Sequence, residues 1–512
     1  MDTKMNEMKL LCCRFSAILW LFITNFSAFQ TLANEPEVPQ IFTQKLQLAY
    51  FEIQKLRLEK ARLLLGQEKN QTPENPAIVY LENYADMYYL LISEDKAAFE
   101  RLGKQQDLRL EKLDKLPASS PYKRFLKAEI RLHWAFIKLK FGNEVSASWD
   151  IIKAYRLLEE NQKMFPTFLP TLKSLGLLHV LIGSVPEQYS WVTRILGLSG
   201  NINQGIRELR LVQQKEPLFR QEAELIDLLL HAYTLQLDHS QIRLLKNLPD
   251  RQPDNLLIHF FATSVLMKEG RSEEALRILT KAPRTAAHIS FPFLDYLLAE
   301  IQLQKGEYEV AYTNYSKFQK SFKGFNFLKD SYFKQFLCRW LTGQDAQAKA
   351  RLALLPKVGE TIVESDQYAA KFASMYTSGK VKAEQKILFE ARYASDGGFL
   401  EQASEVISKV SEVSFAEESN RAEFNYRKGR ILQKMKEEEQ ALVFFERALQ
   451  LAQKSGLYYA PSSALQMGYI YKEKNQKNLA IAFFKKAMSF KKHEYKNSID
   501  NKARAALTEL GA

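Results

Sequence analysis

Seven histidines are the side chains best suited to metal binding or acid–base chemistry. They are His133, His179, His231, His239, His259, His288 and His493. No two of them stand four residues apart, the spacing that puts two imidazoles on one helix face, and the HExxH pattern is absent. Isolated histidines most often serve in packing or on the surface. The sequence therefore predicts no metal site.

Nucleophilic and phosphate-binding chemistry finds little support either. Cys338 stands close to Trp340, and no base that could activate its thiol is evident. The patterns GxGxxG, GxxxxGK[ST] and GxSxG are all missing. Glu364-Ser365 is similar to the catalytic dipeptide of lytic transglycosylases, but the Gly-rich and Met-Gln patterns that follow it in those enzymes are absent. We therefore expect a protein without catalytic activity and without a cofactor.

Two copies of one spacing pattern near the C-terminus indicate the elements that organise the chain. A Gly is followed by Ala, Phe and Ala at offsets of 12, 16 and 19 residues. The members are Gly429, Ala441, Phe445 and Ala448, then Gly468, Ala480, Phe484 and Ala487. Residues three or four apart share one helix face, and small residues let two antiparallel helices approach while Phe fills the gap. The pattern resembles the tetratricopeptide repeat, which implies helical hairpins.

A second signature, Gly-x4-Ala, extends this pattern towards the N-terminus. It occurs at Gly142/Ala147, Gly270/Ala275, Gly306/Ala311, Gly343/Ala348 and Gly398/Ala403. Glycine ends a helix in the left-handed conformation at no steric cost, and the Ala begins the packed face of the next helix. Strand signals are essentially absent, and a helix is expected over residues 96–113. The sequence predicts an all-α, tetratricopeptide-like helical-hairpin solenoid with a right-handed superhelix.

The segment 165–215 departs from the repeat because glycine and proline interrupt it. A long apolar helix (Leu172–Ile182) ends at Gly183-Ser184-Val185-Pro186, and Gly197, Gly200 and Gly205 precede the next helix. Taken with the paired C-terminal repeats, this arrangement resembles the eukaryotic family of inclusion-body clearance proteins and related exported repeat proteins of Bacteroidetes. That resemblance implies a scaffolding or adaptor role and no reaction.

The N-terminus has the pattern of an export signal. Lys4, Lys9 and Arg14 precede the apolar run Phe15–Phe29, and Thr31-Leu32-Ala33 offers small residues for cleavage. The run is shorter than the ~20 residues that span a bilayer. We expect a cleaved signal peptide, with no integral membrane span after cleavage, and a location in the periplasm or cell envelope of a Gram-negative bacterium. An uncleaved membrane anchor is the alternative.

Composition and the positions of glycine and proline divide the chain into five parts. With 46% hydrophobic and 26% charged residues, the chain falls outside the disordered and polytopic membrane classes. The parts are a signal peptide (1–33), N-terminal helical hairpins (34–164), the Gly/Pro-punctuated segment (165–215), degenerate repeats (216–420), and two clear repeats with a basic capping helix (421–512).

Positive charge concentrates at the C-terminal end. From Lys472 onward ten Lys and Arg face four acidic residues, which is +6 of the net +13. Such a cluster attracts an anionic envelope component or an acidic partner, and nucleic acid is not expected for an exported protein. A solvated face of the capping helix is the alternative.

The predicted function depends on the concave face, which the first helix of each hairpin lines. The repeat offsets place there Tyr426, Arg430, Gln433, Leu465, Tyr469, Lys472, Tyr296 and Glu300. Tyr and Arg are frequent interface anchors, although Tyr426 and Tyr469 could instead pack between repeats. We expect an exported scaffold that binds a protein partner. The alternative is a glycan- or lipid-binding module, which an aromatic-lined pocket in residues 165–211 would favour.

Overall fold

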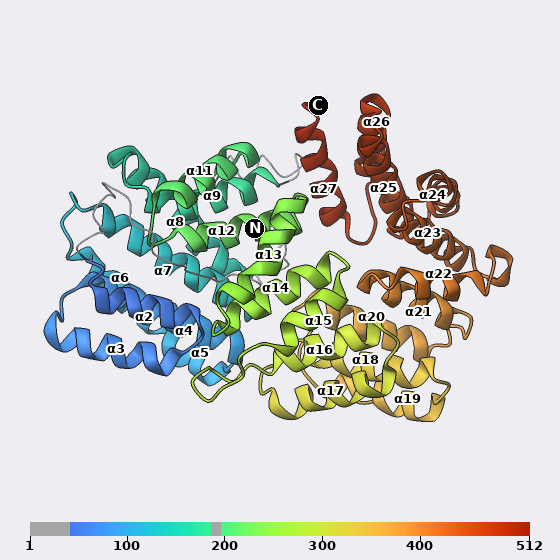
Figure 1. Ribbon diagram of the computed structural model, residues 1–512, viewed down its shortest axis with the longest axis horizontal. Coiled ribbons are helices and arrows are strands. Elements are labelled where there is room, and N and C mark those ends of the chain that lie inside the picture. The colour runs from blue at the N-terminus through green and yellow to red at the C-terminus, as the bar shows by residue number, and fades with distance from the viewer. Residues whose placement is uncertain (1–40, 186–195) are drawn as a thin grey trace.

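The computed structural model describes residues 41–185 and 196–512, and these residues form a helical array without β-strands (Figure 1). Successive helices pack as antiparallel pairs, which confirms the predicted all-α class. The predicted signal peptide (1–33) and part of the Gly/Pro segment (186–195) lie outside the described residues. Within the described part of the chain, no helix has the length and apolar character needed to cross a membrane.

The first half of the array runs from α2 to α15. Its helices are α2 (Gln44–Gln54), α3 (Leu58–Gln71), α4 (Pro76–Ser93), α5 (Lys96–Gly103), α6 (Gln105–Asp114), α7 (Pro121–Lys140), α8 (Glu144–Met164), α9 (Pro170–Gly183), α11 (Ile202–Lys215), α12 (Arg220–Tyr233), α13 (His239–Arg251), α14 (Leu256–Lys268) and α15 (Ser272–Thr280). The prediction of a single helix over residues 96–113 is wrong in one respect. The chain bends after Gly103, a weak helix former, and makes two helices.

The second half contains five hairpins, one extra helix and the C-terminal helix. Its elements are α16 (Phe293–Gln304), α17 (Tyr308–Ser321), α18 (Leu328–Leu341), α19 (Asp345–Leu352), the 3-10 turn Leu355–Lys357, α20 (Glu364–Thr377), α21 (Gln385–Gly397), α22 (Leu400–Ser408), the 3-10 turn Glu412–Ser414, α23 (Glu418–Lys434), α24 (Glu438–Ala452), α25 (Tyr459–Glu473), α26 (Lys477–Ser489) and α27 (Lys496–Glu509).

The turns inside the hairpins adopt the left-handed conformation that the Gly-x4-Ala signature predicts. The φ angles of Gly142, Gly270, Gly306, Gly343 and Gly398 are 76°, 68°, 78°, 77° and 86°. In the two C-terminal hairpins the same position holds Lys436 and Asn475, with φ angles of 66° and 57°. The turn geometry is therefore kept even where the glycine is lost.

The paired helices approach closely where glycine faces an aromatic ring. A Cβ atom added to Gly429 would lie 2.9 Å from the Phe445 ring, and one added to Gly468 would lie 2.6 Å from the Phe484 ring. Both phenylalanines are fully buried. A tighter contact joins α9 to α11, where a Cβ on Gly205 would lie 2.4 Å from the carbonyl oxygen of Gly176. Any larger side chain would separate these helices.

The C-terminal helix α27 brings the end of the array back to its middle. It packs on α25 and α26 (Figure 1). It also lines a cleft with α11 and α12. With its amide oriented to donate, the Asn501 side-chain nitrogen lies 2.7 Å from the carbonyl oxygen of Ser184. We call this junction of α11, α12 and α27 the seam.

Replacing Gly468 by alanine tests the close approach of α25 and α26. The added Cβ would meet the buried Phe484 ring, so we expect Gly468→Ala to destabilise the fold by about 1–3 kcal/mol, the usual cost of overpacking. Gly66→Ala is the matched control, because nothing lies within 4 Å of a Cβ added there. In helix α3 that change should stabilise by about 0.5–1 kcal/mol. Urea unfolding measures both, and an equal effect of the two changes would contradict the contact.

Candidate partner-binding surface

The first group of predicted surface residues lies on α23. Tyr426 is buried, and its ring centroid lies 5.7 Å from those of Tyr458 and Tyr459. Arg430 is half-buried and donates hydrogen bonds to Gln433 (2.7 Å) on its own helix and to Gln466 on α25. Arg430 and Gln433 are thus partly exposed, whereas Tyr426 fills the space between repeats.

The second group lies on α25. Leu465 is buried, and the half-buried Tyr469 ring packs edge-on against Phe484 with centroids 5.2 Å apart. Lys472 forms an ion pair with Glu509 of α27. The C-terminal helix therefore covers part of the predicted groove. The partner-binding role of these residues stays a prediction.

The earlier pair, Tyr296 and Glu300 on α16, belongs to a buried ionic cluster. Lys334 of α18 lies 2.7 Å from a Glu300 carboxylate oxygen, and the Tyr296 hydroxyl donates to Asp330 at 2.5 Å. Burial raises the pKa of Glu300, an effect that the charge of Lys334 opposes. Burial also raises the pKa of the Cys338 thiol beside this cluster, so the thiolate that a nucleophile requires is disfavoured.

A second buried ionic cluster joins α7, α9 and α12. The Lys173 ammonium lies 2.6 Å from Glu129 and 2.8 Å from Glu222, and Glu222 also accepts a hydrogen bond from Tyr50 at 2.7 Å. Burial raises the pKa of Glu129, again opposed by the charge of Lys173, and burial holds the pKa of His133 well below its usual range. Every charge here has a partner, which suits a structural cross-link better than acid–base catalysis.

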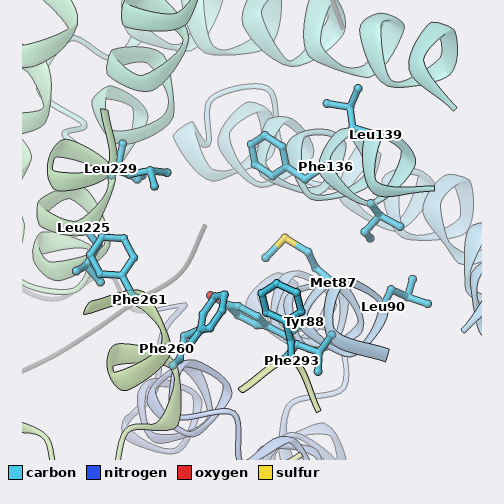
Figure 2. Close-up of a cluster of buried hydrophobic side chains, with 14 of the residues drawn as sticks. Met87, Tyr88, Leu90, Phe136, Leu139, Leu225, Leu229, Phe260, Phe261 and Phe293 are labelled. Carbon is cyan, nitrogen blue, oxygen red and sulfur yellow. The ribbon is translucent and has the colours of Figure 1, made fainter. Parts of the chain in front are cut away.

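A small cavity adjoins this second cluster. Its volume is about 30 Å³, and part of its apolar wall consists of Met87, Tyr88, Phe136, Leu225 and Leu229 (Figure 2). Such a volume holds one or two water molecules and is too small for a sugar ring. In the described part of the chain, no group of three or more His, Cys, Asp and Glu side chains could hold a metal ion.

Four cations from three helices lie close enough to affect one another's pKa, and we call them the basic cluster. They are Lys268 at the end of α14, Arg430 and Lys434 on α23, and Lys502 on α27. Burial, reinforced by the charge of Arg430, lowers the pKa of Lys434 to about 8. Burial, with the charges of Lys268 and Arg430, does the same to the pKa of Lys502.

The members of the basic cluster differ in whether their charged groups form an ion pair or a hydrogen bond. Lys268 pairs with the neighbouring Glu269 at 3.0 Å, and Lys434 donates to the backbone carbonyl of Ser395. Among the described residues, the half-buried Lys502 has neither a hydrogen bond nor an ion pair for its ammonium group. A half-buried cation beside other cations is a place where an incoming carboxylate would be favoured.

Comparison with known families identifies the paired C-terminal hairpins. Residues 422–455 and 461–493 match the family model of the tetratricopeptide repeat. These two segments are tetratricopeptide repeats. They cover most of α23–α24 and α25–α26, the helices that carry the two copies of the Gly, Ala, Phe, Ala pattern. Tetratricopeptide repeats are stacking units whose concave surfaces commonly bind other proteins.

Two other comparisons add little. No curated protein matches the chain. Among solved structures the chain is similar to one described as the crystal structure of the APC/C hetero-tetramer Cut9-Hcn1, with 12% identity and a TM-score of 0.26, covering 91% of this chain and 97% of that chain. A likeness at that TM-score carries no conclusion about function.

Sequence reasoning found Arg430 but missed the rest of the basic cluster. Lys434 follows Arg430 by four residues, so the two cations share one face of α23. Lys502 belongs to the basic C-terminal stretch, which was expected to act as a whole. No spacing rule connects either residue with Lys268, because the three positions are far apart in the sequence.

Removing the Lys502 charge should stabilise the fold. Its folded-state pKa of about 8 lies below the unfolded value of ~10.4, so the unfolded chain binds more protons between these values and stability rises with pH across that window. We expect Lys502→Met to raise Tm at pH 7 by about 1–2 °C and to flatten the rise between pH 8 and 10.

The matched control is Lys485→Met on the exposed surface of α26. Thermal unfolding of both variants and the wild type at pH 7 and 9.5 makes the comparison. If Lys502→Met lowered Tm, or if its pH profile ran parallel to that of the wild type, the lysine would not carry a cost in the folded state.

Proposed function

We propose that the protein is an exported, non-catalytic tetratricopeptide-repeat scaffold that binds an acidic segment of a protein partner on its inner face. The observation that carries the proposal is Lys502, a half-buried cation that forms no ion pair with a described residue and lies near Arg430 and the Lys268–Glu269 pair. An Asp or Glu side chain of a partner would supply the missing charge. The excess of positive charge on the chain would speed the approach of such a partner.

The resemblance to inclusion-body clearance proteins supports the adaptor part of the proposal and rests on sequence pattern alone. The absence of catalysis is supported by the two buried ionic clusters, in which a lysine holds each of two carboxylates in an ion pair. A glycan- or lipid-binding module gains no support, because the cavity beside Lys173 has room for only one or two water molecules. Among the described residues that line the larger cleft between α11, α12 and α27, none is Phe, Tyr or Trp. An anionic envelope component is the alternative ligand of the basic cluster, and the binding experiment below distinguishes it from a protein partner.

Export is tested by N-terminal sequencing of the mature protein. We expect the chain isolated from the native cell envelope to begin at Asn34, because Thr31 and Ala33 supply the small residues that signal peptidases require. A chain that begins at Met1 would contradict cleavage, whatever the result of the partner experiment.

Partner binding is tested by photocrosslinking from Gln433, which stands beside Arg430 at 2.7 Å. The probe is placed in otherwise wild-type protein, in Lys502→Glu and in Lys485→Glu, two variants with equal net charge. We expect one defined protein to crosslink to the wild type and to Lys485→Glu, with at least a tenfold loss in Lys502→Glu and at high salt, where exposed charges are screened.

Two controls complete this experiment. A probe at Leu479, an exposed residue of α26, should not capture the same protein. Vesicles of anionic lipid should not compete for capture. Equal crosslinking of both charge variants would contradict a role for the basic cluster, and loss of capture on adding vesicles would favour the envelope component.

A further inference from the structure

The seam contains a cleft that the scaffold role does not use. Its volume is about 310 Å³, and it is lined by α11, α12 and α27. The floor is apolar and consists of Ile202, Ile206, Leu235 and Ala505. A pocket of ~300 Å³ lies at the small end of the range for small-molecule sites, so its occupant would have few atoms.

Two arginines of α11 give the cleft its charge. Arg207 and Arg210 are three residues apart, so they lie on the same side of the helix, and both line the cleft. Both are exposed, and neither guanidinium has a hydrogen bond or ion pair with a described residue. Two free guanidinium groups at a cleft suit bidentate binding of a phosphate or carboxylate.

One histidine and several charged groups surround this pair. His231 of α12 lines the cleft, and its Nδ1 lies 2.8 Å from the carbonyl oxygen of Asp227. Burial lowers the pKa of His231, but the hydrogen bond and charge of Asp227 outweigh burial and leave the pKa raised. The charges that act near it are those of Asp227, Asp238 and Arg210, and Glu509 lines the same cleft in an ion pair with Lys472.

We propose that the seam cleft binds a small organic anion whose phosphate or carboxylate group is held by Arg207 and Arg210 and whose short apolar body rests on the floor. Such a ligand would bridge α11 and α27 and so join two distant parts of the array. The proposal is independent of the protein partner, because the basic cluster contributes no residue to this cleft.

Titration calorimetry of the full mature chain tests the site with four probes. Phenyl phosphate and benzoate carry both features, inorganic phosphate lacks the apolar body, and benzyl alcohol lacks the charge. We expect the two organic anions to bind at least tenfold more tightly than either of the others. Binding of inorganic phosphate as tight as that of phenyl phosphate would overturn the apolar part of the proposal.

A matched pair of variants tests the arginines. Arg207→Ala/Arg210→Ala should weaken phenyl phosphate at least tenfold, whereas Arg243→Ala/Arg277→Ala, which removes two exposed arginines from α13 and α15, should leave binding unchanged. Circular dichroism and Tm confirm that both variants fold. Equal affinities of the two double variants would overturn the proposal.

The pH dependence of benzoate binding adds a second readout, since benzoate stays ionised from pH 6 to 8. Protonation of His231 adds a positive charge to the cleft, so affinity should rise severalfold as pH falls across that range. The rise should disappear in His231→Gln and persist in His239→Gln, an exposed residue at the start of α13. A pH-independent affinity in the wild type would overturn the part assigned to His231.

Discussion

The close contact between a small residue and an aromatic ring sets the spacing of the helix pairs, and the rest of the structure depends on that spacing. In the two tetratricopeptide repeats the contact is Gly429 against Phe445 and Gly468 against Phe484. Between α9 and α11 the same approach is reached with glycine on both sides, because Gly205 faces the backbone of Gly176. Each pair adds a fixed rotation to the next, so local side-chain volume determines the curvature of the whole array.

Buried charge specifies how the pairs stack once the spacing is set. Lys173 binds Glu129 and Glu222, which come from two other helices, and Lys334 binds Glu300 of a neighbouring hairpin. Burying such ions costs desolvation free energy that their attraction roughly offsets. These ion pairs instead fix how neighbouring helices are aligned, because a helix that slid by one turn would leave a charge buried without a partner. The same argument explains why Tyr296 and Glu300 serve the interior of the protein.

The local features of the fold were predictable from the sequence, and the long-range ones were not. The turn glycines and the paired C-terminal repeats follow from spacing within forty residues, since each hairpin encodes its own packing. The break after Gly103 was not predictable, because one glycine weakens a helix without necessarily ending it. The seam forms only because the array curves over more than twenty helices. No spacing pattern in the sequence predicts the total curvature, so the contact of α27 with α11 and α12 could not be predicted. For this reason the sequence identified Arg430 as a candidate and left Lys268, Arg207 and Arg210 unassigned.

The return of α27 changes what the inner face of the array can do. An open solenoid offers a broad groove, and the predicted partner-binding surface assumes such a groove. Here Lys472 is held by Glu509 of α27, while Lys502 of the same helix faces Lys268 and Arg430. The return of α27 therefore covers part of the predicted groove and brings together residues that are distant in the sequence. A half-buried cation such as Lys502, which forms no ion pair with a described residue, weakens the fold, and a protein keeps such a cost most readily where a ligand or partner supplies the opposite charge.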